Sequence, residues 1–192
     1  NDENYQGKEL RLKQQYFFCS ASLQDIIRKY KKTYGNDFSH FAEMNAIQLN
    51  DTHPVISIPE LIRLLTDGEG LSFDYALDIC KQVFAYTNHT ILAEALEKWS
   101  QHLMERTIPR VFHIIVMLDQ YLGGELHQKG IAGDKEYSMH ILQHGTVHMA
   151  YMAIYCSRYI NDVAQQHTEI SKNHAQRDRH QNYPEKFQNK TN

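Results

Sequence analysis

Cysteine is scarce in this chain of 192 residues, and the three that occur argue against a disulfide framework. Cys19, Cys80 and Cys156 are odd in number, lie far apart and sit in apolar stretches. A free thiol in such a setting behaves as a small hydrophobic side chain. The sequence therefore predicts three free thiols.

Long apolar runs and an excess of charge of one sign are also missing. No run approaches the roughly 18 to 20 apolar residues needed to cross a bilayer, and no charged-then-apolar leader opens the sequence. The net charge is −3 with acids and bases interspersed, whereas a nucleic-acid surface carries a basic face or stripe. We therefore expect a cytoplasmic protein that binds neither membrane nor nucleic acid.

The first half of the chain alternates between helical and strand patterns. Apolar residues at helical spacing predict a long amphipathic helix, and short apolar runs predict buried strands that open into polar loops. Ser57 and Glu60 form a capping-box pattern at a helix start. The predicted segments are helix 8–32, strand 46–49, a helix from Ser57 to the glycines at 68 and 70, helix 72–83 and strand 83–86. This repeat is typical of an α/β sheet, whose ligands bind at the carboxyl ends of the strands.

The second half has a less regular pattern. Its predicted segments are helix 104–127 with a kink or restart at Pro109, a polar loop over 129–137, an apolar strand over 147–155, a helix over 160–170 and an exposed polar connector over 171–185.

Three histidines suggest a metal site as an alternative. His140, His144 and His148 stand at i, i+4 and i+8, which would line one face of a helix. Gly145 interrupts that helix, and no carboxylate or cysteine in the motif completes a ligand set. The pattern therefore favours a polar-faced helix end with solvated or locally paired histidines over a metal centre.

Two further histidines follow the predicted strands of the first half. His53 and His89 are each flanked by Thr and Asn or Asp, a cluster of directional donors and acceptors suited to polyhydroxylated ligands. Taken alone, such a cluster is a capped turn more often than a sugar site.

Acidic residues allow a glycosidase-like interpretation with paired carboxylates at Asp2, Asp51, Glu94 and Glu97. For Glu94 and Glu97 the alternative is an amphipathic helix that carries solvent-facing charge above Leu96 and Trp99. The sequence does not set the carboxylate separation that such a mechanism requires. It also contains no Gly-rich phosphate loop and no Ser–His–Asp or Cys–His signature.

Four blocks of this sequence resemble the α-glucan phosphorylases, which act on glycogen, starch or maltodextrin. They are Glu-Leu-Arg-Leu-Lys-Gln at 9–14, Asn-Asp-Thr-His-Pro at 50–54, Ala-Tyr-Thr-Asn-His-Thr at 85–90 followed by Glu-Ala-Leu-Glu-Lys-Trp at 94–99, and Lys-Phe-Gln-Asn-Lys-Thr-Asn at 186–192. The resemblance implies a GT-B fold of two Rossmann-like lobes. Residues 1–192 are expected to be an internal fragment of the N-terminal lobe, helix-rich with a small and mostly parallel sheet, without the C-terminal cofactor-binding lobe.

The resemblance also implies an activity. Phosphorylases cleave terminal α-1,4-glucosidic bonds with phosphate, retain configuration and release α-glucose 1-phosphate. The phosphate group of pyridoxal phosphate assists the proton transfer, and this cofactor is bound outside the matching segment. The parent enzyme is expected to bind α-1,4-glucan and phosphate as a homodimer. The isolated chain is expected to bind no cofactor, to be inactive, and to self-associate through exposed sheet edges.

Site residues follow from the same resemblance. His89 matches the histidine that contacts the bound glucosyl unit, and Asp2 matches the aspartate of a loop that gates the cleft. Asp51, His53 and Thr90 match residues that line the sugar pocket, and Asn88 is grouped with them as substrate-binding. A self-standing carbohydrate-binding or regulatory module and a His-rich metal-binding protein remain as alternatives.

Overall fold

The computed structural model describes residues 4–90, 93–162 and 181–188. The elements in chain order are α1 (Tyr5–Tyr34), α2 (Phe41–Met44), β1 (Ile47–Asn50), α3 (Ser57–Arg63), the π-helical turn η1 (Leu64–Gly68), α4 (Phe73–Val83), β2 (Phe84–Asn88), the 3₁₀ turn η2 (Ala93–Ala95), β3 (Lys98–Ser100), α5 (Gln101–Thr107), α6 (Pro109–Gln128), α7 (Gly133–Tyr137), β4 (Leu142–Gln143), β5 (Thr146–His148), α8 (Met149–Cys156), β6 (Tyr159–Asp162) and the 3₁₀ turn η4 (Pro184–Lys186).

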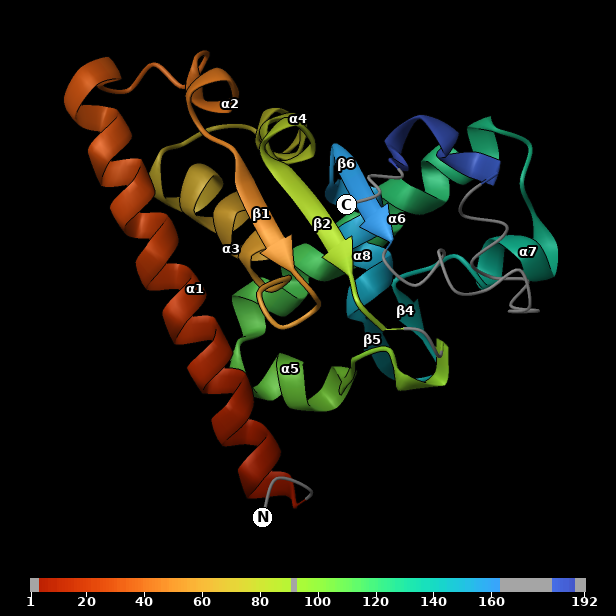
Figure 1. Ribbon diagram of the computed structural model, residues 1–192. Coiled ribbons are helices and arrows are strands. Elements are labelled where there is room, and N and C mark those ends of the chain that lie inside the picture. The colour runs from red at the N-terminus through yellow and green to blue at the C-terminus, as the bar shows by residue number, and fades with distance from the viewer. Residues whose placement is uncertain (1–3, 91–92, 163–180, 189–192) are drawn as a thin grey trace.

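A three-stranded parallel sheet with the order β1-β2-β6 forms the centre of the fold (Figure 1). Phe187 makes an isolated parallel bridge with Ile160, so the chain near its end lies along the outer edge of β6. A separate antiparallel sheet has the order β3-β5-β4. The fold class is therefore α/β, rich in helix with small sheets, and the mostly parallel central sheet agrees with the prediction.

The two faces of the central sheet differ in burial. Along β2, Phe84, Tyr86 and Asn88 are buried while Ala85 and Thr87 are half-buried, because successive side chains of a strand point to opposite faces. The buried face packs against helices, with α8 in contact with β2 and α4 in contact with α8. In Figure 1, β2 lies in front of α8. Within the described residues, the opposite face of the sheet remains accessible.

Helix α1 flanks the sheet and packs against α3 and α5 (Figure 1). The Asn4 side chain caps its start by accepting a hydrogen bond from the Gly7 N–H at 2.7 Å. The buried face of α1 carries Leu12, Leu23 and Ile27, as the apolar spacing predicts. The prediction of a long amphipathic helix is confirmed, and so are strands near 46–49 and 83–86, the helix over 72–83 and the restart at Pro109.

The predicted capping box at Ser57 and Glu60 is wrong. Helix α3 has no side-chain cap, and both residues are buried. The Glu60 carboxylate faces inward, where it accepts hydrogen bonds from the Arg63 guanidinium and from Ser20 Oγ of α1. An ion pair within α3 and a tertiary hydrogen bond from Ser20 therefore replace the predicted cap. The helical run continues through η1 and ends near Gly70, which adopts a φ of 73°.

Three predictions for the second half are wrong where the structure describes the chain. The apolar segment 147–155 forms strand only at its start, and from Met149 the chain is helix α8, buried on nearly all sides. Residues 160–162, the start of the helix predicted over 160–170, belong to strand β6. The predicted loop over 129–137 contains α7. The rest of that predicted helix, 163–170, and residues 171–180 of the predicted connector lie outside the described residues.

The cysteines confirm the prediction of free thiols. Cys80 and Cys156 are buried, Cys19 is half-buried, and all three are free. Burial raises the pKa of Cys156 to about 12, so this thiol stays protonated and unreactive at neutral pH. Among the described residues, no helix is long and apolar enough to span a bilayer.

Candidate functional site at the carboxyl edge of the sheet

The two polar motifs of the first half meet at one edge of the central sheet. Strands β1 and β2 are parallel with Asn50 opposite Thr87, so the residues that follow each strand emerge side by side. His89 Nε2 lies 2.7 Å from Asn50 Oδ1. Both side chains are exposed. This is the edge at which ligands of open α/β sheets bind, and the structure brings there the histidine singled out in the sequence.

Asp51 turns the chain at the end of β1. It has a φ of 65°, in the left-handed region that Asp adopts more readily than most residues. Its N–H donates to the Thr87 carbonyl at 2.9 Å, and its Oδ1 accepts from the Thr52 N–H at 2.7 Å. Thr52 is buried and His53 is exposed on the following turn. The backbone and side chain of Asp51 therefore fix how the loop with His53 leaves the sheet.

Asn88 organises the second loop. It is buried, and its Oδ1 accepts from the Thr90 N–H at 3.2 Å while its Nδ2 donates to the Thr90 carbonyl at 3.1 Å. These two bonds close a tight loop around His89. Asn88 thus supports the loop that presents His89 at the surface.

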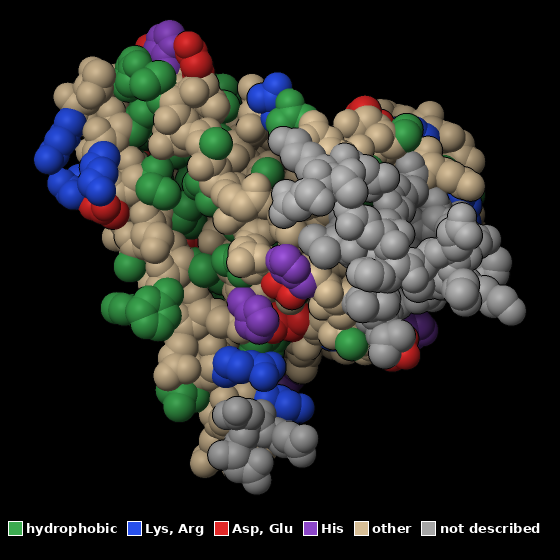
Figure 2. All heavy atoms as spheres, viewed as in Figure 1, with side chains coloured by type: hydrophobic (Ala, Val, Ile, Leu, Met, Phe, Trp, Pro, Cys, Tyr) green, Lys and Arg blue, Asp and Glu red, His purple; other side chains and the backbone are tan. Residues whose placement is uncertain are grey.

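The remaining sequence-predicted site residues lie differently. Asp2 falls outside the described residues. Thr90 is half-buried on the second loop beside Asn88. Figure 2, seen from the same side as Figure 1, shows histidine and acidic side chains gathered on the surface below the tips of β1 and β2. Asn50 was not among the predicted site residues, although its place directly before Asp51 at a strand end was a usable signal.

Glu94 and Glu97 do not lie on an amphipathic helix as that alternative required. They belong to the η2 turn and the residue before β3, and Glu97 Oε1 accepts a hydrogen bond from Trp99 Nε1 at 3.3 Å. Leu96 and Trp99 are buried, as the same alternative predicted. Glu97 is therefore engaged in holding the indole, and Glu94 is exposed.

The histidines proposed to line one helix face do not share a helix. His140 lies before β4 and His148 ends β5. His140 Nδ1 is 2.9 Å from Asp119 Oδ1, and the His148 ring stacks on Tyr151 with centroids 4.7 Å apart. In the ranges 4–90, 93–162 and 181–188 no group of three or more His, Cys, Asp or Glu side chains could hold a metal ion. His140 is therefore a locally paired histidine, with Asp119 as its partner.

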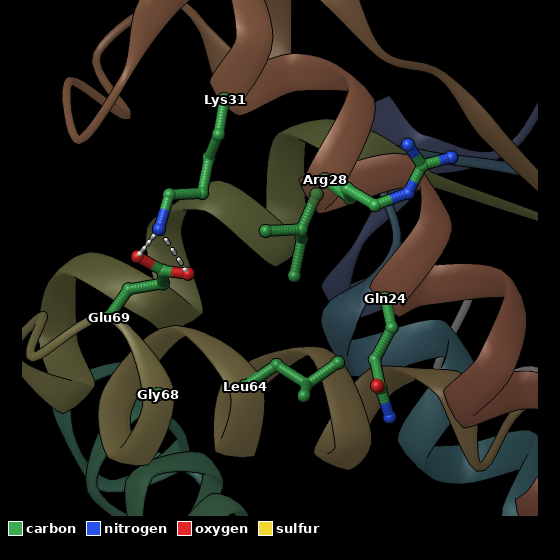
Figure 3. Close-up of a pocket in the computed structure, with 7 residues that line it drawn as sticks. Gln24, Arg28, Lys31, Leu64, Gly68 and Glu69 are labelled. Atoms are coloured by element: carbon green, nitrogen blue, oxygen red, sulfur yellow. Dashed lines mark hydrogen bonds and ion pairs between the residues drawn. The ribbon is translucent and has the colours of Figure 1, made fainter.

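A separate hollow of about 450 Å³ lies between α1 and the η1 turn (Figure 3). Lys31 Nζ donates to both carboxylate oxygens of Glu69, at 2.8 and 3.1 Å, across this hollow. Leu64 and Ile27 supply apolar lining. Figure 3 shows the Arg28 guanidinium directed away from the ion pair. Lys31 is thus neutralised by Glu69 within this hollow.

The fold and this edge describe an α/β protein with a polar, ligand-accessible cluster at the carboxyl ends of parallel strands. The carbohydrate phosphorylase family model matches residues 1–192. The chain belongs to the carbohydrate phosphorylase family, which confirms the resemblance drawn from the four sequence blocks.

Individual relatives agree with that membership. The chain is 46% identical over 200 residues to the alpha-glucan phosphorylase H isozyme of Solanum tuberosum, and it covers 24% of that protein. It is 47% identical over 197 residues to glycogen phosphorylase 2 of Dictyostelium discoideum and covers 20% of it. It is 45% identical over 204 residues to the muscle form of glycogen phosphorylase of Rattus norvegicus and covers 24% of it. Each match includes the whole of this chain, which thus spans about a quarter or less of its relatives.

Proposed function

We propose that the polypeptide carrying this sequence is an α-glucan phosphorylase that releases α-glucose 1-phosphate from terminal α-1,4 bonds with retention of configuration. The chain would supply part of the N-terminal lobe of a GT-B fold. The observation that carries the proposal is the placement of His89 against Asn50 at the carboxyl edge of the parallel sheet. The names of the relatives support the same activity.

His89 is the residue to which we assign the main substrate contact. Its imidazole is exposed at the open edge and is fixed on one side by Asn50, so it can offer a directional hydrogen bond to a sugar hydroxyl. Asp51, His53, Asn88 and Thr90 would shape the surrounding pocket. For Asp2 we propose a role in the gate loop, where a carboxylate would stabilise positive charge that develops on the sugar ring.

Pyridoxal phosphate is the cofactor that this family implies, and it would supply the phosphate group that assists proton transfer. The described lysine with a lowered pKa, Lys186, does not fit a cofactor site. Its ammonium donates to the carbonyl oxygens of Ile154 and Tyr155, at 3.1 and 2.8 Å, and lies over the Tyr183 ring. We therefore place the cofactor elsewhere in the polypeptide. The isolated chain is expected to bind none and to be inactive.

The proposed partners are α-1,4-glucan and phosphate, in a cytoplasmic homodimer. The accessible face of the central sheet supports self-association of the isolated chain, because in α/β folds built on parallel sheets both faces are normally covered.

The test is His89→Ala in the polypeptide at its natural length. Turnover of maltodextrin with phosphate should fall by roughly one to three orders of magnitude, the range expected when a positioned hydrogen bond to the reacting group is lost. His113→Ala, which removes an exposed histidine of α6, is the control and should retain turnover. Unchanged kinetics in His89→Ala would remove His89 from the site. Glucose 1-phosphate release by residues 1–192 alone would contradict the proposal that the isolated chain is inactive and that the cofactor is bound elsewhere in the polypeptide.

A further inference from the structure

We propose that Asn50 is a positioning residue for His89, which it fixes in the tautomer that carries its proton on Nε2. The inference rests on the proposed function for its catalytic consequence, but its structural half can be tested independently. Asn50 Oδ1 lies 2.7 Å from His89 Nε2. An amide oxygen only accepts hydrogen bonds, so Nε2 must donate, and in the neutral ring Nδ1 is then an acceptor.

The strand register explains why Asn50 reaches His89. Asn50 is paired with Thr87 of the neighbouring strand β2. Its side chain contacts His89, which lies two positions after Thr87. Gln48 repeats the arrangement one step earlier, since it is paired with Ala85 and its Nε2 donates to Thr87 Oγ1 at 2.8 Å. Alternate residues of a strand share a face, so Gln48 and Asn50 project from the same side of β1. His89 thus ends a row of cross-strand polar bridges on the accessible face of the sheet.

This arrangement gives the His89 ring a defined direction. Its Nε2 is held against β1, and Nδ1 is left with a lone pair for a ligand at the exposed edge. A sugar hydroxyl bound there must donate its proton to Nδ1.

The structural half is tested by NMR on the natural-length polypeptide with ¹³C-labelled histidine, with the His89 signal assigned from its loss in His89→Gln. The wild-type ring should show the Nε2–H tautomer. In Asn50→Ala the amide oxygen that holds Nε2–H is removed, and the ring should lose its preference for that tautomer. Gln48→Ala is the matched control, since it removes the neighbouring bridge without touching His89, and it should leave the His89 tautomer unchanged.

The functional half is tested by kinetics in the same polypeptide. Asn50→Ala should lower kcat about 3- to 30-fold with a smaller change in KM, since His89 remains present but is no longer held. Gln48→Ala should stay within about 2-fold of wild type.

The outcomes separate the two proposals. A wild-type His89 ring in the Nδ1–H tautomer, or an Nε2–H tautomer that persists unchanged in Asn50→Ala, would overturn the positioning role even if His89→Ala abolishes turnover. If NMR shows the expected tautomer and its loss in Asn50→Ala while His89→Ala leaves kcat unchanged, the Asn50 contact stands and the assignment of His89 to the sugar site fails. Equal losses of kcat in Asn50→Ala and Gln48→Ala would show that the loss of any polar bridge between β1 and β2 lowers kcat. That result would overturn the specific role of Asn50.

Discussion

The buried ion pair between Glu60 and Arg63 should contribute more to stability than any exposed pair of similar geometry. The Glu60 side chain is 0% exposed and that of Arg63 is 28% exposed. The guanidinium approaches the carboxylate at 2.6, 2.9 and 3.1 Å, and Ser20 Oγ adds a fourth bond at 2.9 Å. This pairing, with the Glu60 hydrogen bond as its main cause, holds the pKa of Arg63 above its ordinary range.

Removal of one partner leaves the other without its counter-charge. Breaking a buried pair costs about 3 to 5 kcal/mol, and charge-assisted hydrogen bonds contribute about 1.5 to 3 kcal/mol each. Because Arg63 retains partial access to water, we expect Glu60→Ala to lower the free energy of unfolding by about 3 kcal/mol, at the lower end of that range. The coupling energy from the cycle of Glu60→Ala, Arg63→Ala and the double variant should be about 1.5 to 3 kcal/mol.

The assay is equilibrium urea unfolding of the four proteins followed by circular dichroism. The matched control is a cycle on Asp67 and Arg110, a pair joined by two hydrogen bonds of 2.8 Å whose side chains are 39% and 47% exposed. That exposed pair should give a coupling of about 0.2 to 1 kcal/mol. A coupling for Glu60 and Arg63 no larger than for the control would refute the argument that burial, and not contact geometry, sets the strength of this pair.

Three further predictions concern other parts of the chain. Gly124→Ala should raise the free energy of unfolding by about 0.5 to 1 kcal/mol, because alanine favours helix over glycine and nothing lies within 4 Å of the added Cβ. In Gly123→Ala the added Cβ would lie 3.1 Å from His140 Cε1, so this gain should be lost, and thermal melts of the two variants test the difference. Ser72→Ala should cost about 1 kcal/mol in urea unfolding, because Ser72 Oγ caps α4 by accepting from a backbone N–H at 3.2 Å, and an unchanged midpoint would contradict this cap. Burial lowers the pKa of Lys186 to about 8, so between pH 8 and its ordinary pKa of 10.5 the unfolded chain binds more protons than the folded chain, and the free energy of unfolding rises with pH. The difference in stability between wild type and Lys186→Met should therefore shift in favour of wild type over that interval. A difference that stays constant with pH would contradict the lowered pKa of Lys186.

Local patterns in the sequence were sufficient for much of the first half. Strands β1 and β2 are short apolar runs followed by polar loops, and α1 and α4 have clear helical spacing, so each segment could be predicted from its own residues. Parallel strands have their carboxyl ends at one edge of a sheet, and this rule predicts from the sequence that the motifs around Asp51 and His89 lie at that edge. The family was also evident from the sequence blocks, because motif identity does not depend on packing.

Tertiary structure decided the features for which local patterns are ambiguous. Met149 to Cys156 is apolar almost throughout, and a fully buried helix and a buried strand have the same pattern in such a run, so only packing against β2 and α4 selects helix α8. Glu60 fits a capping box locally, but Ser20 lies 40 positions earlier in the chain and draws its carboxylate into the interior. Asn50 and His89 lie 39 positions apart, and their contact depends on the register between β1 and β2, which no local pattern determines.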